Sequence, residues 1–450
     1  MPERYFLETL GCPKNQVDSD KLEGTLIAAG MVRTGEASLA DLVVVNTCAF
    51  IEAARQESID TILTLAEQRR DGAKLVVTGC MAERYGDELA EALPEVDQIA
   101  GFGVALAPMA PSASSATIPV RIGVKPAPVL PTLDLLNMPR PRSNSPWAYV
   151  KIAEGCDRSC GFCAIPSFRG PQRSRSVASI LDEIDALRVS EVVLIAQDLA
   201  SYGKDDPTLG AGSIVDLVAE ASRRVERVRL LYLYPSDLDD ALVDAICDTG
   251  LPYFDLSLQH VSKPLLRRMR RWGDGQRFLD RITSIRSREP QAAFRSNFIV
   301  GYPGETESDH DALLRFVDEA QLDWCGFFAY CREEGTHAAD LDGQVDPSLV
   351  SERLGELTER QDRITAARRD ALIGTSTTVL IDSVGVARSH REAPEIDGII
   401  EVPETLPPGA FVDVEIVSAL GPDLTALPIG EPRATRIDAI VAGANAELLR

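Results

Sequence analysis

Three cysteines lie within eight residues of one another and form the pattern C-x3-C-x2-C, at Cys156, Cys160 and Cys163. Thiolates are soft ligands that suit zinc or iron–sulfur clusters. Structural zinc usually takes four ligands from paired C-x2-C elements, whereas no fourth cysteine or histidine lies nearby in this sequence. The pattern therefore favours a [4Fe–4S] cluster that is held by three thiolates and keeps one iron open for another ligand. A structural zinc or cluster site is the alternative.

Three more cysteines occupy equivalent positions after predicted strands, although they do not form a sequence motif. Cys12, Cys48 and Cys80 each follow a short apolar segment that predicts a strand, at residues 5–10, 42–46 and 74–78. Open parallel sheets bind ligands at the carboxyl ends of their strands, so these thiols are expected to meet there. Helical patterns begin after each cysteine, and the positive helix end should favour the thiolate. Three buried core cysteines are the alternative to a second, separate cluster with an open iron.

The elements that would position these cysteines alternate between strand and helix. Residues 1–100 predict a parallel sheet covered by helices. A second alternating stretch predicts an incomplete parallel barrel of six βα units, with strands at residues 147–153, 191–196, 228–233, 254–258, 294–300 and 326–330. Short strands and turns near the C-terminus predict a small antiparallel barrel.

A proline-rich stretch separates the first two regions. Residues 103–146 hold nine of the 28 prolines, which predicts an extended linker with one short strand at residues 118–122. The expected domains are therefore residues 1–102, a linker 103–146, a central domain 147–372 that ends in a charged helix, and a C-terminal barrel 373–441.

The composition and net charge limit the classes of partner that this chain is expected to bind. The 450 residues contain 46 Lys and Arg against 69 Asp and Glu, a net charge of −23. Such a chain repels nucleic acid and anionic membranes and attracts basic partners. It shows no apolar run long enough to span a membrane, and its start lacks the apolar stretch of a signal peptide. We therefore expect a cytoplasmic protein with no membrane partner, whose nine cysteines are thiols or metal ligands.

The C-x3-C-x2-C motif at the end of the first barrel strand resembles that of the radical S-adenosylmethionine (SAM) superfamily. The resemblance implies that the open iron chelates SAM and that an electron cleaves SAM to a 5′-deoxyadenosyl radical. Phe162 matches the aromatic residue beside the adenine, with simple packing as an equal alternative. The segment 297–305 resembles a SAM-contacting strand, which makes Gly301 and Glu305 candidate contacts, although glycines after strands also form ordinary turns. No catalytic acid, base or nucleophile is singled out.

The order of the three domains resembles that of the methylthiotransferases, whose C-terminal barrel is a TRAM domain. Several stretches are similar to the RimO branch, among them residues 11–15, 46–51, 148–156, 165–170, 196–198 and 330–336. The resemblance implies two [4Fe–4S] clusters, the second one on Cys12, Cys48 and Cys80 for sulfur insertion. It also implies SAM as cosubstrate, an electron donor, a sulfur donor, and an aspartate of small-subunit ribosomal protein twelve as the target.

Charge gives an independent criterion for the substrate. Residues 371–438 contain four Arg, no Lys and eleven Asp and Glu, a balance of −7. An RNA-binding barrel should be basic, whereas an acidic barrel suits a basic ribosomal protein. A tRNA adenosine substrate is therefore the less favoured alternative. A non-catalytic iron–sulfur scaffold or RNA-binding protein is the alternative from another class.

A few other side chains carry open interpretations. Arg169, Arg173 and Arg175 form a basic run that is either solvated surface or a partner for a substrate or cofactor carboxylate. His260 is expected to follow a barrel strand, with structural and functional roles equally weighted. The remaining cysteines are expected to be structural, namely Cys247, Cys325 and Cys331.

Overall fold

The computed structural model describes residues 2–106, 133–209, 213–433 and 435. The chain forms two compact units, Met1–Pro141 with Ser167–Gly170, and Arg142–Pro166 with Pro171–Arg450. The domain boundaries expected at residues 102, 146 and 372 stay predictions. Within the described residues, no helix combines the length and apolar character that a membrane crossing needs.

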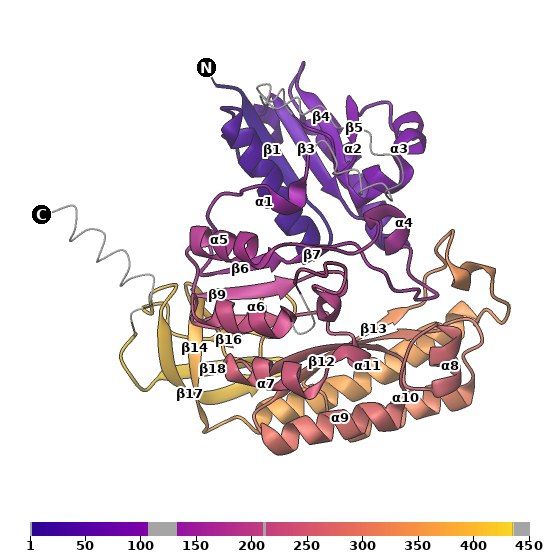
Figure 1. The fold of residues 1–450 in the computed structure, drawn as a ribbon, viewed down its shortest axis with the longest axis vertical. Helices are drawn as coiled ribbons and strands as arrows, with labels where there is room; N and C mark the ends of the chain where they lie inside the picture. Colours follow the sequence, from indigo (N-terminus) through magenta and orange to yellow (C-terminus); the bar gives the residue numbers. More distant parts are fainter. Residues whose placement is uncertain (1, 107–132, 210–212, 434, 436–450) are drawn as a thin grey trace, which may run out of the picture. The chain divides into compact units, whose positions relative to one another are not determined.

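The N-terminal unit is built on a five-stranded parallel sheet with the order β2-β1-β3-β4-β5 (Figure 1). The strands are β1 (Arg4–Thr9), β2 (Val32–Arg33), β3 (Leu42–Thr47), β4 (Lys74–Gly79) and β5 (Gln98–Ala100). The helices are α1 (Pro13–Ala28), α2 (Glu52–Gln68) and α3 (Cys80–Ala92). The predicted open parallel sheet is confirmed, and the edge strands β2 and β5 are too short to show a sequence period.

Side chains of this sheet alternate between two apolar cores. Val43 and Val45 of β3 pack on the face that α2 and α3 cover. Val44 and Val76 pack on the opposite face, with residues of α1. A strand that is buried on both faces reads as a continuous apolar run, which is why LVVV in β3 was recognisable from sequence.

The described end of the predicted linker is not extended. Leu133 and Leu135 are buried in the second core, and the Lys21 Nζ donates to the carbonyl of Leu136 at 2.6 Å. Apolar side chains here pack back onto the unit despite the prolines around them, which corrects the expectation for this part. The strand expected at residues 118–122 lies outside the described residues.

The second unit begins with six parallel strands in two three-stranded sheets, β10-β9-β6 and β11-β12-β13, joined by a parallel bridge between Leu233 and Leu256. The strands are β6 (Trp147–Lys151), β9 (Glu191–Ile195), β10 (Arg227–Leu230), β11 (Tyr253–Gln259), β12 (Ala293–Val300) and β13 (Trp324–Ala329). A short hairpin is formed by β7 (Ala153–Glu154) and β8 (Arg173–Ser174). The expected partial barrel of six βα units is confirmed.

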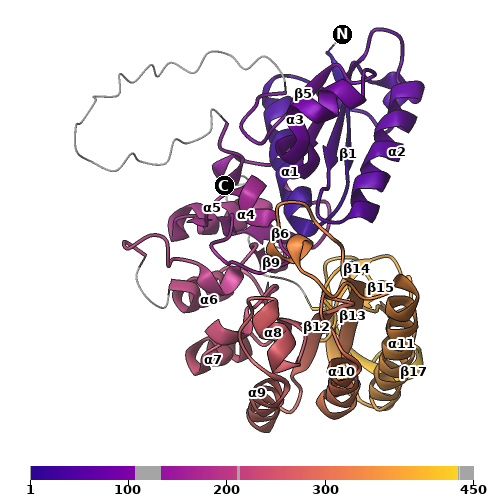
Figure 2. The same ribbon diagram turned by 90° about the vertical axis from the view of Figure 1, so that its right-hand side faces the viewer.

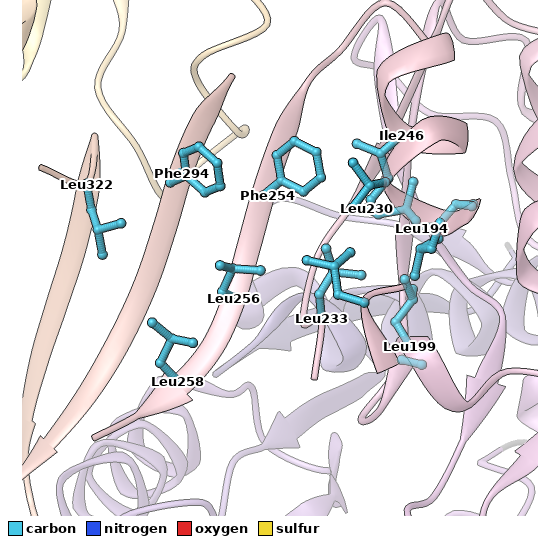
Figure 3. Close-up of a cluster of buried hydrophobic side chains, with 14 of the residues drawn as sticks. Leu194, Leu199, Leu230, Leu233, Ile246, Phe254, Leu256, Leu258, Phe294 and Leu322 are labelled. Carbon is cyan, nitrogen blue, oxygen red and sulfur yellow. The ribbon is translucent and has the colours of Figure 1, made fainter. Parts of the chain in front are cut away.

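Helices of the second unit cover the outside of these strands, and α11 runs along β13 beside α10 (Figure 2). They are α5 (Val177–Leu187), α6 (Ser213–Ser222), α7 (Asp240–Asp248), α8 (Lys263–Arg268), α9 (Gly275–Arg288), α10 (Glu307–Ala320) and α11 (Pro347–Asp370). The short helix α4 (Ile165–Arg169) lies mostly in the segment Ser167–Gly170, which belongs to the N-terminal unit. Figure 3 shows part of the core under them, where Phe254 and Phe294 stack across neighbouring strands with centroids 5.4 Å apart.

The C-terminal strands close into a small barrel with the order β14-β15-β16-β18-β17. They are β14 (Ser376–Ser383), β15 (Val386–Arg388), β16 (Ile400–Glu401), β17 (Phe411–Leu420) and β18 (Asp423–Pro428). The pairs are antiparallel except β16 with β18, which is parallel and corrects the purely antiparallel expectation. This parallel pair closes the barrel, an arrangement that no local pattern reports.

A buried ion cluster joins the C-terminal barrel to the central strands. The carboxylate of Glu191 is fully buried and lies 2.9 Å from Arg229 Nε and 3.2 Å from Arg388 Nη1, with Arg227 Nη1 at 3.8 Å. Arg227 also donates to the carbonyls of Thr378 and Arg388 in the C-terminal barrel, at 2.9 and 3.0 Å. Burial alone would raise the pKa of Glu191, but the three guanidinium charges outweigh it and lower the pKa to about 2.

Candidate functional site

Strand register brings Cys12, Cys48 and Cys80 to one edge of the N-terminal sheet. Thr9 of β1 pairs with Asn46 of β3, and Asn46 pairs with Thr78 of β4, so the three strands end level with one another. Each cysteine follows within three residues of this row. The thiols are close enough that a charge on Cys12 raises the pKa of both Cys48 and Cys80. The expected meeting of the three cysteines is thus what the fold produces.

Two glycines make this approach possible. Gly11 has a φ of +93°, and a Cβ there would stand 2.8 Å from the Cβ and 2.9 Å from the Sγ of Cys48. Gly79 has a φ of +92°, and a Cβ there would stand 2.2 Å from Asn46 Oδ1. Contacts this short exclude any side chain, and both backbones occupy the region that glycine alone visits freely. Each glycine directly precedes a cysteine of the group.

Asn15 ties the strand ends together beneath the thiols. Its side chain is fully buried and its Nδ2 donates to the carbonyls of Leu10 and Thr47, both at 2.9 Å. Its Oδ1 lies 3.4 Å from the Sγ of Cys80. Sequence reasoning included Asn15 only as part of a motif, because nothing local shows that an amide will bridge two loops.

Arg169 reaches the same edge from a segment far along the chain. Its Nη2 lies 3.0 Å from Cys80 Sγ and 2.7 Å from Asn15 Oδ1, while Nη1 pairs with Asp18 at 2.8 Å. The solvated-surface interpretation of this arginine is therefore wrong. Its carboxylate partner is Asp18 of the chain itself, and pairing with a substrate or cofactor carboxylate stays a prediction. Burial of both partners makes the pair strongly dependent on its geometry.

Helix position does not lower the pKa of Cys48 or Cys80 as expected. Cys12 caps α1, and Cys80 opens α3, but burial raises the pKa of Cys48 to about 11 and also raises that of Cys80. Desolvation disfavours the charged thiolate more strongly than the helix ends favour it. Ligand binding here would have to displace the thiol protons, which couples binding to pH.

The C-x3-C-x2-C loop follows β7 in the second unit and is held by its backbone. The Gly161 N–H donates to the carbonyl of Met269 at 2.8 Å, and its carbonyl accepts from the Ala338 N–H at 2.7 Å. Met269 follows β11 and α8, and Ala338 follows β13 in a 3-10 turn. These partners come after the carboxyl ends of barrel strands, so the loop lies at the mouth where such folds bind substrates.

Charged side chains surround this loop. Arg271 Nη1 lies 3.3 Å from the Sγ of Cys160, and the ring of Tyr234 lies between Arg271 and Arg158, at 4.1 and 3.9 Å from their guanidinium carbons. Arg158 in turn pairs with Asp198 and Asp237. Burial raises the pKa of Cys156 to about 11. Neither Arg271 nor Tyr234 belongs to a motif, so the sequence offered no signal for them.

The three candidate SAM contacts differ in their surroundings. Phe162 is partly buried and packs against the barrel core. Glu305 accepts from the Gly301 N–H at 2.6 Å and from Arg353 Nη1 at 2.9 Å, and a Cβ at Gly301 would meet Val350 at 2.4 Å. Gly301 and Glu305 thus hold each other and α11, and SAM contact by any of the three stays a prediction.

Other singled-out residues lie within the fold, and a functional role for His260 stays a prediction. His260 is fully buried, its Nδ1 accepts from the Ser262 N–H at 3.0 Å, and burial lowers its pKa to about 4. Arg175 is buried against Glu183 at 2.7 Å, so the surface interpretation is wrong there as well. Cys325 lies inside β13 rather than beside it.

Both cysteine groups fit the donor set of an iron–sulfur cluster. Each offers three thiols, the soft donors that iron–sulfur clusters take. In the part of the chain that is described, no three Cys, His, Asp or Glu side chains converge closely enough to hold one metal ion. A cluster that takes one thiolate per iron spreads its ligands more widely than a single ion does.

Family models match three stretches of the chain. Residues 4–101 match the Uncharacterized protein family UPF0004, residues 150–317 match the Radical SAM superfamily, and residues 373–429 match the TRAM domain. The two cysteine groups lie in the first and second stretches. Among solved structures, the radical S-adenosylmethionine methyltransferase TsrM from Kitasatospora setae covers 75% of this chain and 77% of its own, with 16% identity and a TM-score of 0.47.

Two relatives align along nearly the whole chain. The ribosomal protein uS12 methylthiotransferase RimO of Cutibacterium acnes is 40% identical, covering 94% of this chain and 97% of its own. The RimO of Anaeromyxobacter sp. is 42% identical, covering 94% and 93%. The chain therefore belongs to the RimO family of ribosomal protein uS12 methylthiotransferases.

Proposed function

We propose that this enzyme converts a C–H bond on the β-carbon of an aspartate in ribosomal protein uS12 into C–S–CH3, which forms β-methylthio-aspartate. The observation that carries the proposal is the identity of about two residues in five with RimO proteins over nearly the full length of both chains. All three expected parts of the fold are present in the chain that would perform this reaction.

The proposal assigns one [4Fe–4S] cluster to Cys156, Cys160 and Cys163 and a second one to Cys12, Cys48 and Cys80. When bound, the first cluster with SAM supplies a carbon-centred radical that removes a hydrogen atom, and the second supplies sulfur. Two observations support these assignments. The strands β1, β3 and β4 end level with one another, and two backbone hydrogen bonds hold Gly161 in the loop of the other group. An electron donor, a sulfur donor and a second SAM as methyl source complete the reactants.

The chain's own residues have separate tasks in this scheme. Asn15, Gly11 and Gly79 hold the N-terminal thiols at one sheet edge. Met269 and Ala338 hold the loop of the second group at the barrel mouth. These contacts fix ligand positions before a cluster is present, and such preorganisation is what a catalytic constellation requires.

The surface charge of the C-terminal barrel supports a basic protein as substrate. Arg388 and Arg391 are buried, so their charges do not reach the surface. Exposed acidic residues remain around the barrel, namely Glu395, Glu401, Glu404, Glu415 and Glu431. An acidic surface attracts a basic ribosomal protein and repels the phosphates of tRNA. The tRNA alternative is accordingly not favoured, and a ribosomal substrate supports the expectation that the enzyme acts in the cytoplasm.

Mass spectrometry after anaerobic turnover tests the proposal. The protein is reconstituted with iron and sulfide and then supplied with SAM, a reductant and either uS12 or tRNA. We expect a gain of about 46 Da, for replacement of H by SCH3, on one aspartate of uS12. A gain on tRNA alone would overturn the substrate assignment. Release of deoxyadenosine with no gain on either would leave a radical SAM enzyme with another substrate.

A further inference from the structure

One buried cation in the N-terminal unit has no task in the reaction as proposed. The side chain of Arg169 is 3% exposed and that of Asp18 is 2% exposed, so both charges of this pair have left water. Of the guanidinium contacts, one reaches the sulfur of Cys80 at 3.0 Å. A packing role alone would not require a charged donor at a thiol that is assigned as a ligand.

We propose that Arg169 is a positioning residue that raises the reduction potential of the cluster on Cys12, Cys48 and Cys80, through its charge and its hydrogen bond at the Cys80 sulfur. The inference rests on the proposed assignment of that cluster. Reduction adds a negative charge to a cluster, so a nearby cation and a donor to a ligand sulfur both stabilise the reduced form. Burial strengthens this effect because the surrounding dielectric is low.

The surroundings hold the guanidinium at the sulfur. The ring of Phe102 lies 4.1 Å from its central carbon, Asn15 Oδ1 accepts from Nη2 at 2.7 Å, and Asp18 accepts from Nη1 at 2.8 Å. A side chain fixed on three sides loses little further entropy when a ligand binds nearby. The Nη2 that touches Asn15 is the same atom that touches Cys80, so the amide aims the donor at the thiol.

Arg169 lies close in sequence to the other cysteine group. It lies six residues after Cys163, in the segment Ser167–Gly170 that belongs to the N-terminal unit although its neighbours belong to the other. The residue that completes the surroundings of one cysteine group thus comes from the segment that directly follows the other group. The reduction potential of the cluster decides how readily it accepts an electron. Formation of a C–S bond from a carbon radical and a sulfide releases one electron.

The test measures the potential of one cluster in isolation. In full-length protein that carries Cys156→Ala, Cys160→Ala and Cys163→Ala, only the N-terminal cysteine group remains to bind a cluster. After anaerobic reconstitution, iron content and a redox titration followed by electron paramagnetic resonance give the midpoint. We expect Arg169→Met to move the midpoint to lower potential, and Asp18→Asn, which removes the opposing charge, to move it to higher potential. Arg169→Lys, which keeps the charge, should give a smaller shift than Arg169→Met.

Midpoint shifts of opposite sign in Arg169→Met and Asp18→Asn distinguish electrostatic tuning from a loss of packing. The control is Arg69→Met, which removes a cation of the same unit that pairs with Asp97, and it should leave the midpoint unchanged. If the background protein binds no iron, the proposed second cluster fails. If it binds iron and the midpoints of Arg169→Met and Asp18→Asn equal that of the background, or both shift in one direction, the tuning role is refuted. If Arg169→Met does not hold iron, the midpoints of Asp18→Asn and Arg169→Lys decide the question in the same way.

Discussion

Glu191→Gln should strongly destabilise the junction between the central strands and the C-terminal barrel. Glu191 is fully buried and is the shared partner of Arg227, Arg229 and Arg388, which also hold carbonyl groups of the C-terminal barrel. The substitution keeps the size of the side chain but leaves three buried guanidinium groups without this negative charge. Breaking a buried ion pair from one side costs about 3–5 kcal/mol.

The lowered pKa of Glu191 sets the pH range over which this contribution is lost. It falls from the ordinary 4.5 to about 2 in the folded chain, and at about 1.4 kcal/mol for each pKa unit this is about 3 kcal/mol of stability. Because the folded pKa is depressed, this contribution is complete above pH 4.5 and is lost as the pH falls from 4.5 toward 2. A loss of 3 kcal/mol corresponds to a melting temperature about 6–12 °C lower for a unit of this size.

Tryptophan fluorescence during urea and thermal unfolding reports on this junction. The ring of Trp147 lies 5.7 Å from the guanidinium of Arg388, and Trp324 Nε1 donates to the carbonyl of Arg391 at 2.7 Å. The control is Glu220→Gln on a half-exposed surface pair, which should change stability by less than about 0.5 kcal/mol. The reasoning is refuted if Glu191→Gln is as mild as the control at pH 7, or if the difference between Glu191→Gln and the unsubstituted protein does not shrink below pH 4.5.

Three further predictions concern the cysteine groups and the substrate. Cys160→Ala should abolish deoxyadenosine release, measured by chromatography. Cys48→Ala should keep that release but lose the mass gain on uS12. Loss of release in both folded variants would contradict the division of tasks. Gly79→Ala should lower the urea midpoint of unfolding far more than Gly30→Ala. Gly30 has a similar φ of +84°, but a Cβ there would meet nothing within 4 Å. Only the backbone cost of about 1–2 kcal/mol therefore applies at Gly30. Equal losses would show that the close approach to Asn46 is unimportant. The affinity for uS12, measured by calorimetry, should fall severalfold between low salt and about 0.15 M ionic strength, and an affinity independent of salt would refute the docking role of the acidic barrel.

The elements and both cysteine groups could be read from the sequence because each leaves a local signal. The run LVVV of β3 is apolar at every position since both faces are covered. A motif of three cysteines within eight residues needs no tertiary information. The short strand β15 leaves no such signal, because three residues cannot show a period.

The sequence by itself determined the fold class, the two groups of candidate ligands and the family resemblance. Only the tertiary structure decided the surroundings of those ligands. Arg169 meets Cys80 across 89 positions of sequence, and Glu191 meets Arg388 across 197. Hydrophobic periodicity reports which face of an element is buried. It does not report which buried charges will face one another, because that depends on strand order and register, and these arise only when distant segments pack.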